Sequence, residues 1–393
     1  MDTINDFIAS ALPYTEWPMF LLLIGGGLFL VFYSKLMPYR FFGHAIAITA
    51  GKYDNKDSKG DVSSFQALSA AVAATVGLGN ISGVAIAIHD GGPGVVFWIW
   101  MTALIGMCIK FYSCSLAIMY RGIDSEGKLQ GGPMYYITKG LGEKARPLAI
   151  FFAVCGLFGF LGVFTANQFT ETFMSVVDPG TTLIEMSDQN WKWTIGITEA
   201  WNFKSLATGG FWGLVIIGVR RAMFSNEAGL GSAPMYHGQS KNDEPIREGL
   251  VAMLGPFIDT ILVCTFTAIV IILSGAYLED SSGIVMTLSA FETTLFGWGD
   301  ILLMVIVTAF ALSTLFTYSY YGVKSLSFLT NAKIGRFYNW YFVIMIVFAA
   351  VASLELVKNL IDLSYALMVI PNMIAVLLLA PKVNVELKKY IIK

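Results

Sequence analysis

Long apolar runs recur along almost the whole of this 393-residue chain and restrict its fold more than any other feature. Runs of about 20 residues have the length that an α-helix needs to cross a bilayer. The polar segments between them are too short to fold independently. The sequence therefore predicts an all-α integral membrane protein with nine spans, over residues 18–37, 66–90, 94–120, 147–176, 206–222, 249–276, 298–322, 337–357 and 360–381.

The composition agrees with a membrane protein and excludes several function classes. Only 13% of the residues are charged, whereas soluble domains carry about 25%. The net charge of −2 gives no indication of nucleic-acid binding. The chain has no nucleotide-binding loop and no zinc-protease motif, so we expect no enzyme activity. The cysteines lie within apolar runs at spacings that fit no metal site, and we interpret them as packing residues.

The basic residues predict the orientation of the chain in the membrane. With the N-terminus outside and nine spans, the cytoplasmic loops and tail hold all but four of the 25 lysines and arginines. The exceptions are Lys110, Lys192, Lys204 and Lys358. Because cytoplasmic loops are enriched in Lys and Arg, this distribution indicates a multi-pass protein with the N-terminus outside and the C-terminus in the cytoplasm.

The second span contains a segment in its middle that is unfavourable for a helix. Gly77-Leu78-Gly79-Asn80 interrupts it, and each glycine costs a helix interior about 1 kcal/mol relative to alanine. A broken span frees carbonyl groups that can bind a cation and N–H groups that can bind an anion. The alternative is a stripe of small residues for close helix packing. The spacing alone does not decide between these readings.

Two other spans carry polar side chains that lipid cannot satisfy. Residues 164–171, FTANQFTE, could contact an amino-acid ligand or form hydrogen bonds between helices. In the seventh span, Thr314, Thr317 and Tyr318 share one helix face. Their hydroxyl oxygens suit a monovalent cation, and the alternative is hydrogen bonding to carbonyl groups one turn earlier.

The charged residues within or at the end of predicted spans include Lys110, Asp259 and Glu355. Charged groups inside a membrane are costly and are therefore candidates for function. For Lys110 and Glu355 we favour a structural ion pair or a side chain that reaches the interface. Asp259, deep in the sixth span, is a candidate proton site.

Several long stretches together resemble one family of carriers. They are TVGLGNISGVAIAIHDGGPGVVFW (75–98), GGPMYYI (131–137), MFSNEAGLGSAP (223–234), GPFIDTILVCTFTA (255–268), SYYG (319–322), SLELV (353–357) and IPNMIAVLLL (370–379). The sequence resembles the alanine/glycine:cation symporter family, also called the sodium:alanine symporters. These are sodium-coupled carriers of the amino acid–polyamine–cation superfamily. The resemblance implies an inverted-repeat, broken-helix fold in the plasma (inner) membrane that transports a small neutral amino acid such as alanine or glycine.

The resemblance also implies roles for individual residues. Backbone groups at Thr75, Gly77, Leu78 and Gly79 are expected to meet the substrate carboxylate. The sodium ion is expected at the carbonyl groups of Ala73 and Val76 and the hydroxyls of Ser313 and Thr314. The substrate pocket is expected to include Phe164, Thr165, Asn167, Thr314 and Tyr318. Sodium is the coupling ion, and no other cofactor is implied.

The chain departs from the family pattern at three points. Thr165 stands where the family usually has Gln, and Tyr318 where it usually has Trp. Members of the family have eleven spans, whereas no apolar run occurs here between about 177 and 205. We therefore expect one transport domain over 1–393 with an extra N-terminal span and loop (1–62), an incomplete first repeat (63–176), an extracellular loop (177–204), a second repeat (205–381) and a cytoplasmic tail (382–393).

The two missing spans leave three hypotheses open. The chain could be a working sodium symporter, a truncated binding or regulatory remnant of the same fold, or a proton-coupled carrier that uses Asp259.

Overall fold

A computed structural model describes residues 2–53, 60–177, 210–279, 281–295 and 297–392. The N-terminal half consists of α1 (Asp2–Phe20), α2 (Gly26–Tyr33), α3 (Met37–Arg40), α4 (Phe42–Thr49), α5 (Ser64–Thr75), α6 (Leu78–Gly91), α7 (Val95–Met119), a short hairpin of β1 (Gly122–Ile123) and β2 (Leu129–Gln130), α8 (Pro133–Tyr135), α9 (Arg146–Gly159) and α10 (Val163–Val177). The loop predicted at 177–204 falls almost entirely outside the described residues.

The described part of the second half consists mainly of helices. Its helices are α12 (Gly210–Asn226), α13 (Ala233–His237), α14 (Pro245–Ala252), α15 (Leu254–Pro256), a π-helical segment (Phe257–Cys264), α16 (Thr265–Ser274), α17 (Gly283–Leu295), α18 (Gly299–Leu329), α19 (Ala332–Gly335), α20 (Tyr338–Val351) and α21 (Leu354–Ile392). The expected class, an all-α integral membrane protein, is confirmed. The four cysteines are free and buried, as expected of packing residues.

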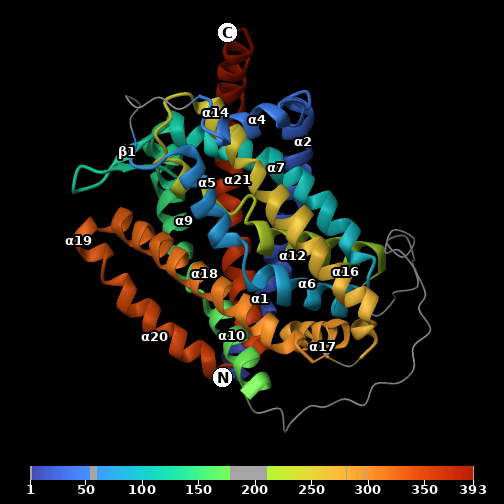
Figure 1. Cartoon of the computed structure of the whole chain (residues 1–393). Helices are drawn as coiled ribbons and strands as arrows, with labels where there is room; N and C mark the ends of the chain where they lie inside the picture. Colours follow the sequence, from blue (N-terminus) through green and yellow to red (C-terminus); the bar gives the residue numbers. More distant parts are fainter. Residues whose placement is uncertain (1, 54–59, 178–209, 280, 296, 393) are drawn as a thin grey trace.

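Each predicted span overlaps helical residues of the structure, although the first crossing begins at Asn5 and not at residue 18. Among the described residues, seven helices are long and apolar enough to cross a bilayer, and α5 with α6 forms an eighth, bent span. The remaining predicted span, 206–222, corresponds to α12, which has 17 residues and is therefore at the lower limit of the length that crosses a bilayer. The two termini lie at opposite ends of the molecule in Figure 1.

The predicted break in the second span is present. α5 ends at Thr75, α6 begins at Leu78, and their axes differ by 43°. Ser63 caps the start of α5 in a capping box with Gln66. At the break, the backbone of Gly77 is fully extended, and Thr314 lies so close that no side chain fits there.

A second discontinuous helix faces the first. α12 ends at Asn226 and α13 begins at Ala233, and the residues between them include Glu227, Gly229 and Gly231, all with positive φ. Positive φ is unfavourable for residues other than glycine, so the chain cannot continue as a helix here. When α12 and α13 are counted as one discontinuous crossing, the described residues contain the expected nine.

The longest described helix that lies wholly outside the predicted spans is α17. Residues 277–297 were predicted as a loop, but α17 occupies Gly283–Leu295 and packs against α6 and α16. It lies at the same end of the molecule as the N-terminus (Figure 1). At 13 residues it is too short to cross a bilayer, and the acidic residues around it hide its apolar character.

Candidate functional site

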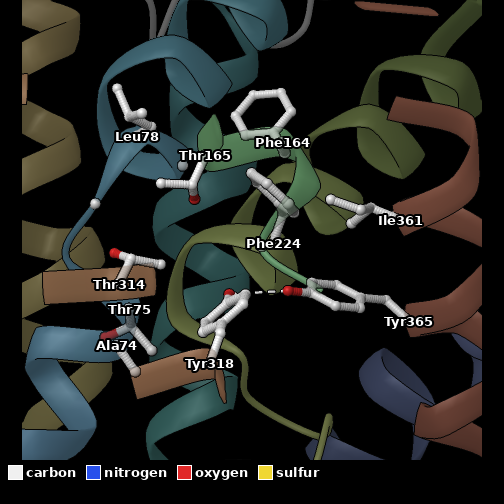
Figure 2. Close-up of a pocket in the computed structure, with 13 residues that line it drawn as sticks. Ala74, Thr75, Leu78, Phe164, Thr165, Phe224, Thr314, Tyr318, Ile361 and Tyr365 are labelled. Carbon is white, nitrogen blue, oxygen red and sulfur yellow. Dashed lines mark hydrogen bonds between the residues drawn. The ribbon is translucent and has the colours of Figure 1, made fainter. Parts of the chain in front are cut away.

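A small pocket lies at the break between α5 and α6, where residues of α10 and the turn before it, of α12, of α18 and of α21 also line it (Figure 2). Its volume is about 10 Å³, roughly the room of one water molecule. An amino acid therefore fits only if the lining groups move apart. The lining residues are Ala74, Thr75, Gly77, Leu78, Gly79, Gly162, Phe164, Thr165, Phe224, Thr314, Tyr318, Ile361 and Tyr365.

The broken span presents carbonyl groups at one side of the pocket. In a continuous helix, the Gly77 N–H would bond to the Ala73 carbonyl. It donates instead to Asn80 Oδ1, at 3.0 Å. Val76 has left the helical conformation, with φ −71° and ψ 98°. The break thus removes the usual helical partner of the Ala73 carbonyl and turns the Val76 carbonyl out of the helix.

The start of α6 offers N–H groups at the same place. The first N–H groups of a helix have no partner within it, and the N-terminus carries a partial positive charge. Leu78 and Gly79, in the first turn of α6, both line the pocket. Donors and acceptors therefore lie side by side, as binding of a carboxylate next to a cation requires.

The Thr314 hydroxyl lies against this break. Thr314 is 3% exposed, and a β-carbon placed on Gly77 would come 2.5 Å from its Oγ1 atom. Oγ1 is buried and makes no hydrogen bond within the described part of the chain. Since buried polar groups are usually paired, a cation or a polar substrate group is the partner that this oxygen fits.

The neighbouring hydroxyls of α18 are bonded locally. Ser313 Oγ donates to the Phe310 carbonyl at 2.9 Å, which leaves its oxygen lone pairs available to a cation. Thr317 Oγ1 donates to the Ser313 carbonyl at 2.7 Å. Thr317 does not line the pocket. Its hydroxyl therefore bonds to a carbonyl group one turn earlier, as was the alternative to cation binding.

A buried polar cluster connects Asp259 to the break. Asn80 Nδ2 donates to Asp259 Oδ1 at 2.5 Å and to the Asp259 carbonyl at 2.9 Å. The hydroxyls of Ser225 and Thr260 donate to Asp259 Oδ2 at 3.1 and 3.2 Å. Because Asn80 Oδ1 also accepts the Gly77 N–H, a chain of hydrogen bonds links the carboxyl group to the half-helix end.

Two arginines predicted in a cytoplasmic loop lie instead inside α12. The prediction for Arg220 and Arg221 was wrong because α12 continues to Asn226, past the expected end of the span. Asp362 Oδ2 lies 3.4 Å from Arg220 Nη1 and 3.2 Å from Arg221 Nη2, and Arg220 also pairs with Glu16. These ion pairs join α12 to α21 and α1 next to the pocket.

The other intramembrane charges have different surroundings. Lys110 is 2% exposed in the middle of α7, and its Nζ atom lies 3.3 Å from the position of a β-carbon placed on Gly255. Glu355 is exposed in the first turn of α21, which agrees with a side chain that reaches the interface.

The structure brings together all the predicted substrate residues except Asn167. Asn167 Nδ2 donates to the carbonyls of Ala349 and Ala352, at 3.1 and 2.8 Å, and so joins helices outside the pocket. Phe164 and Thr165, in the same segment, do line the pocket. The segment 164–171 therefore places some residues at the pocket and uses another for hydrogen bonds between helices. The roles of these residues in substrate binding remain predictions.

Sequence analysis missed five lining residues. Phe224 belongs to the MFSNEAGLGSAP stretch, which carried the resemblance without a role for this position. Tyr365 and Ile361 lie in a long apolar helix with no distinguishing signal. Ala74 and Gly162 are small residues of a kind found throughout the chain.

The comparisons with known proteins agree on one family for this chain. The model of the sodium:alanine symporter family matches residues 1–198 and 183–393. The chain is 35% identical to the sodium/alanine symporter AgcS of Methanococcus maripaludis over 444 residues, covering 99% of this chain and 96% of that protein.

Two relatives from Bacillus subtilis are also similar. The probable sodium/glutamine symporter GlnT is 31% identical, over 98% of this chain and 89% of GlnT. The putative sodium/proton-dependent alanine carrier protein YrbD is 31% identical, over 98% of this chain and 92% of YrbD.

The alignment lengths bear on the missing spans. An alignment of 444 positions with a chain of 393 residues leaves at least 51 positions that this chain does not fill. That number is sufficient for two spans of about 20 residues with their connections. The two matches to the family model overlap at residues 183–198, within the segment where two spans are predicted to be missing.

Proposed function

Because the chain belongs to the sodium:alanine symporter family, we propose that it carries a small neutral amino acid, alanine or glycine, across the plasma membrane together with sodium. The protein is a transporter and not an enzyme. Its N-terminus lies outside and its C-terminus in the cytoplasm. The binding pocket opens alternately to the two sides as the packed half-helices move, and no covalent chemistry takes place.

The Thr314 hydroxyl, which has no hydrogen-bond partner among the described residues, carries this proposal. It lies against the Gly77 break, where the Ala73 and Val76 carbonyls are freed, and these oxygens with Ser313 Oγ form the sodium site. The substrate carboxylate lies beside the ion, at the N–H groups that begin α6. Binding of sodium then fixes the break in the conformation that the substrate needs.

Replacing Thr314 tests the sodium site. Thr314→Ala is expected to raise the sodium concentration for half-maximal alanine uptake by roughly tenfold or more, as loss of a ligand worth about 1.4 kcal/mol predicts. The measurement is uptake of labelled alanine into proteoliposomes over a range of sodium concentrations. Thr317→Ala is the matched control, because that hydroxyl is bonded within its own helix. An equal shift in both variants would remove Thr314 from the site.

A second candidate function is proton coupling through Asp259. The hydrogen-bond chain through Asn80 favours it, because a proton on Asp259 would change a bond that reaches the Gly77 N–H. The name of YrbD includes both ions. If protons drive transport, Asp259→Asn abolishes uptake driven by a pH gradient. If sodium alone drives it, wild-type uptake ignores that gradient.

The third candidate is a remnant that binds amino acids without carrying them. The at least 51 unfilled alignment positions favour it, because they are enough to hold the two spans that the family resemblance leads us to expect between about 177 and 205. Binding of labelled alanine by purified protein, together with no uptake by proteoliposomes of the same preparation, would identify this case.

A further inference from the structure

A buried carboxylate lies behind the pocket, at the break between α12 and α13. Glu227 is 1% exposed and has a φ of 54°. Its two oxygens accept hydrogen bonds from the hydroxyls of Ser232 and Tyr318. The Tyr318 hydroxyl lies 2.9 Å from that of Tyr365. Glu227 is therefore connected to two side chains that line the pocket, although it does not line the pocket itself.

The chemistry of the phenols fixes the direction of these bonds. A phenol has one hydrogen to donate and two lone pairs to accept. Tyr318 donates its hydrogen to the Glu227 carboxylate, so the bond between the tyrosines is donated by Tyr365. Both hydrogens point away from the substrate, and the free capacity of the phenol oxygens is acceptor only.

The two half-helix ends suit the carboxylate and the ammonium group that every amino acid carries. A β-carbon placed on Gly79 would lie 3.5 Å from the Phe224 carbonyl oxygen, so the start of α6 and the last turn of α12 are adjacent. The start of a helix favours a carboxylate, and the unpaired carbonyls of a helix end favour an ammonium group. Both substrate groups are attached to one carbon atom, and these adjacent ends suit them.

The hydroxyls of Tyr318 and Tyr365 remain available to contact the substrate side chain. In Figure 2 the hydroxyls of Tyr318 and Tyr365 face each other on the other side of the pocket from Leu78. We propose that Glu227 orients these phenols so that they accept a hydrogen bond from the substrate side chain, which makes a small hydroxyl amino acid, serine, a better substrate than alanine. This inference rests on the proposed transport of small neutral amino acids.

Competition against labelled glycine measures this preference, because glycine has no side chain to contact the tyrosines. Unlabelled serine and alanine compete for sodium-driven glycine uptake in proteoliposomes, and the readout is the ratio of their inhibition constants. In the wild type we expect serine to be preferred by about threefold to tenfold, the usual value of one net hydrogen bond. Tyr318→Phe and Tyr365→Phe should each abolish most of this preference.

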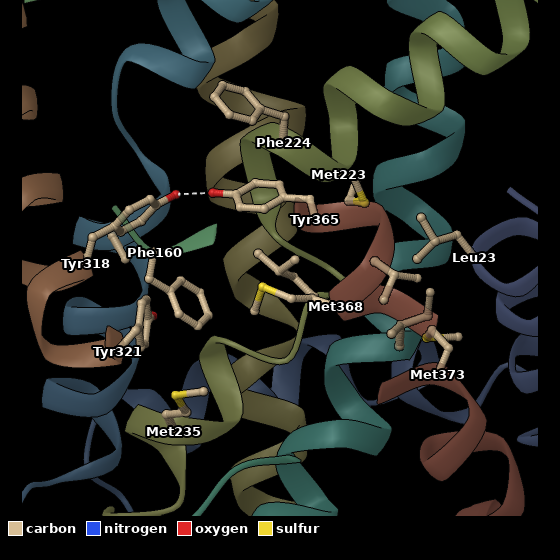
Figure 3. Packing of buried hydrophobic residues seen from close by; sticks show 14 of the residues in the cluster. Leu23, Phe160, Met223, Phe224, Met235, Tyr318, Tyr321, Tyr365, Met368 and Met373 are labelled. Carbon is tan, nitrogen blue, oxygen red and sulfur yellow. Dashed lines mark hydrogen bonds between the residues drawn. The ribbon is translucent and has the colours of Figure 1, made fainter. Parts of the chain in front are cut away.

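Tyr321→Phe is the matched control. Tyr321 lies one turn from Tyr318 and against Phe160 in the apolar core, where Figure 3 shows it beside both residues. It is fully buried, its hydroxyl has no hydrogen-bond partner in the described part of the chain, and it does not line the pocket. Its removal should leave the ratio of serine to alanine unchanged.

Glu227→Gln tests the orienting role separately, since the amide has the same shape and no charge. The ratio should fall toward that of Tyr318→Phe, and a wild-type ratio in this variant would overturn the role of Glu227. Equal competition by serine and alanine in the wild type, or an equal change in Tyr321→Phe, would overturn the polar side-chain site. Absence of sodium-driven glycine uptake in the wild type would instead reject the proposed function.

Discussion

Gly77→Ala is expected to reduce sodium-driven alanine accumulation by about a hundredfold, the loss that a displacement of about 1 Å in a binding site can cause. The new β-carbon would lie 2.5 Å from Thr314 Oγ1, closer than two such atoms can approach. Either Thr314 or the α5–α6 break must move, and both belong to the proposed sodium site. The measurement is uptake of labelled alanine by proteoliposomes with an inward sodium gradient.

Gly25→Ala provides the control for this prediction. A β-carbon on Gly25 meets nothing within 4 Å, so the same chemical change should leave uptake at the wild-type level. Wild-type uptake by Gly77→Ala would show that the break does not hold the ion or the substrate in the way proposed here.

Asp362→Asn is expected to lower the free energy of unfolding by about 3–5 kcal/mol, the usual cost of removing one partner of a buried ion pair. The carboxylate is the partner of Arg221, which is 4% exposed, and a second partner of Arg220. Without it, the Arg221 guanidinium remains buried opposite a neutral amide. Thermal unfolding in detergent, followed by circular dichroism, measures the loss.

Glu126→Gln is the matched control for the charge change. Its partner Arg336 has a side chain that is 63% exposed, and exposed ion pairs contribute about 0–1 kcal/mol. A small, equal loss of stability in both variants would contradict the structural importance of the ion pairs between α12 and α21.

Much of the architecture could be predicted because membrane spans leave a strong signal. The length and apolar character of the runs located the long crossings, and the glycines at 77 and 79 located the break. Short elements were harder to predict. α17 was taken for a loop, and the end of α12 was placed four residues too early, because 13 to 17 residues with charged neighbours do not stand out from loops.

The site was predictable where backbone and hydroxyl patterns mark it, and less so elsewhere. The GLGN segment and Thr314 followed from local features and the family resemblance, and both lie at the pocket. Asn167 was misplaced in the pocket because sequence shows that an amide needs a partner but not which helix supplies it. The hydrogen bonds from Tyr318 to Glu227 and between Tyr318 and Tyr365 connect residues 91 and 47 positions apart, and only the fold brings them together.

The central claim is that sodium drives the transport of a small amino acid through this pocket. The most direct test is uptake of labelled alanine and glycine by proteoliposomes that contain the full chain, with an inward sodium gradient or with potassium in its place. We predict accumulation above the external concentration in sodium and none in potassium. Folded protein that accumulates neither amino acid in sodium, or both equally in potassium, would contradict the claim.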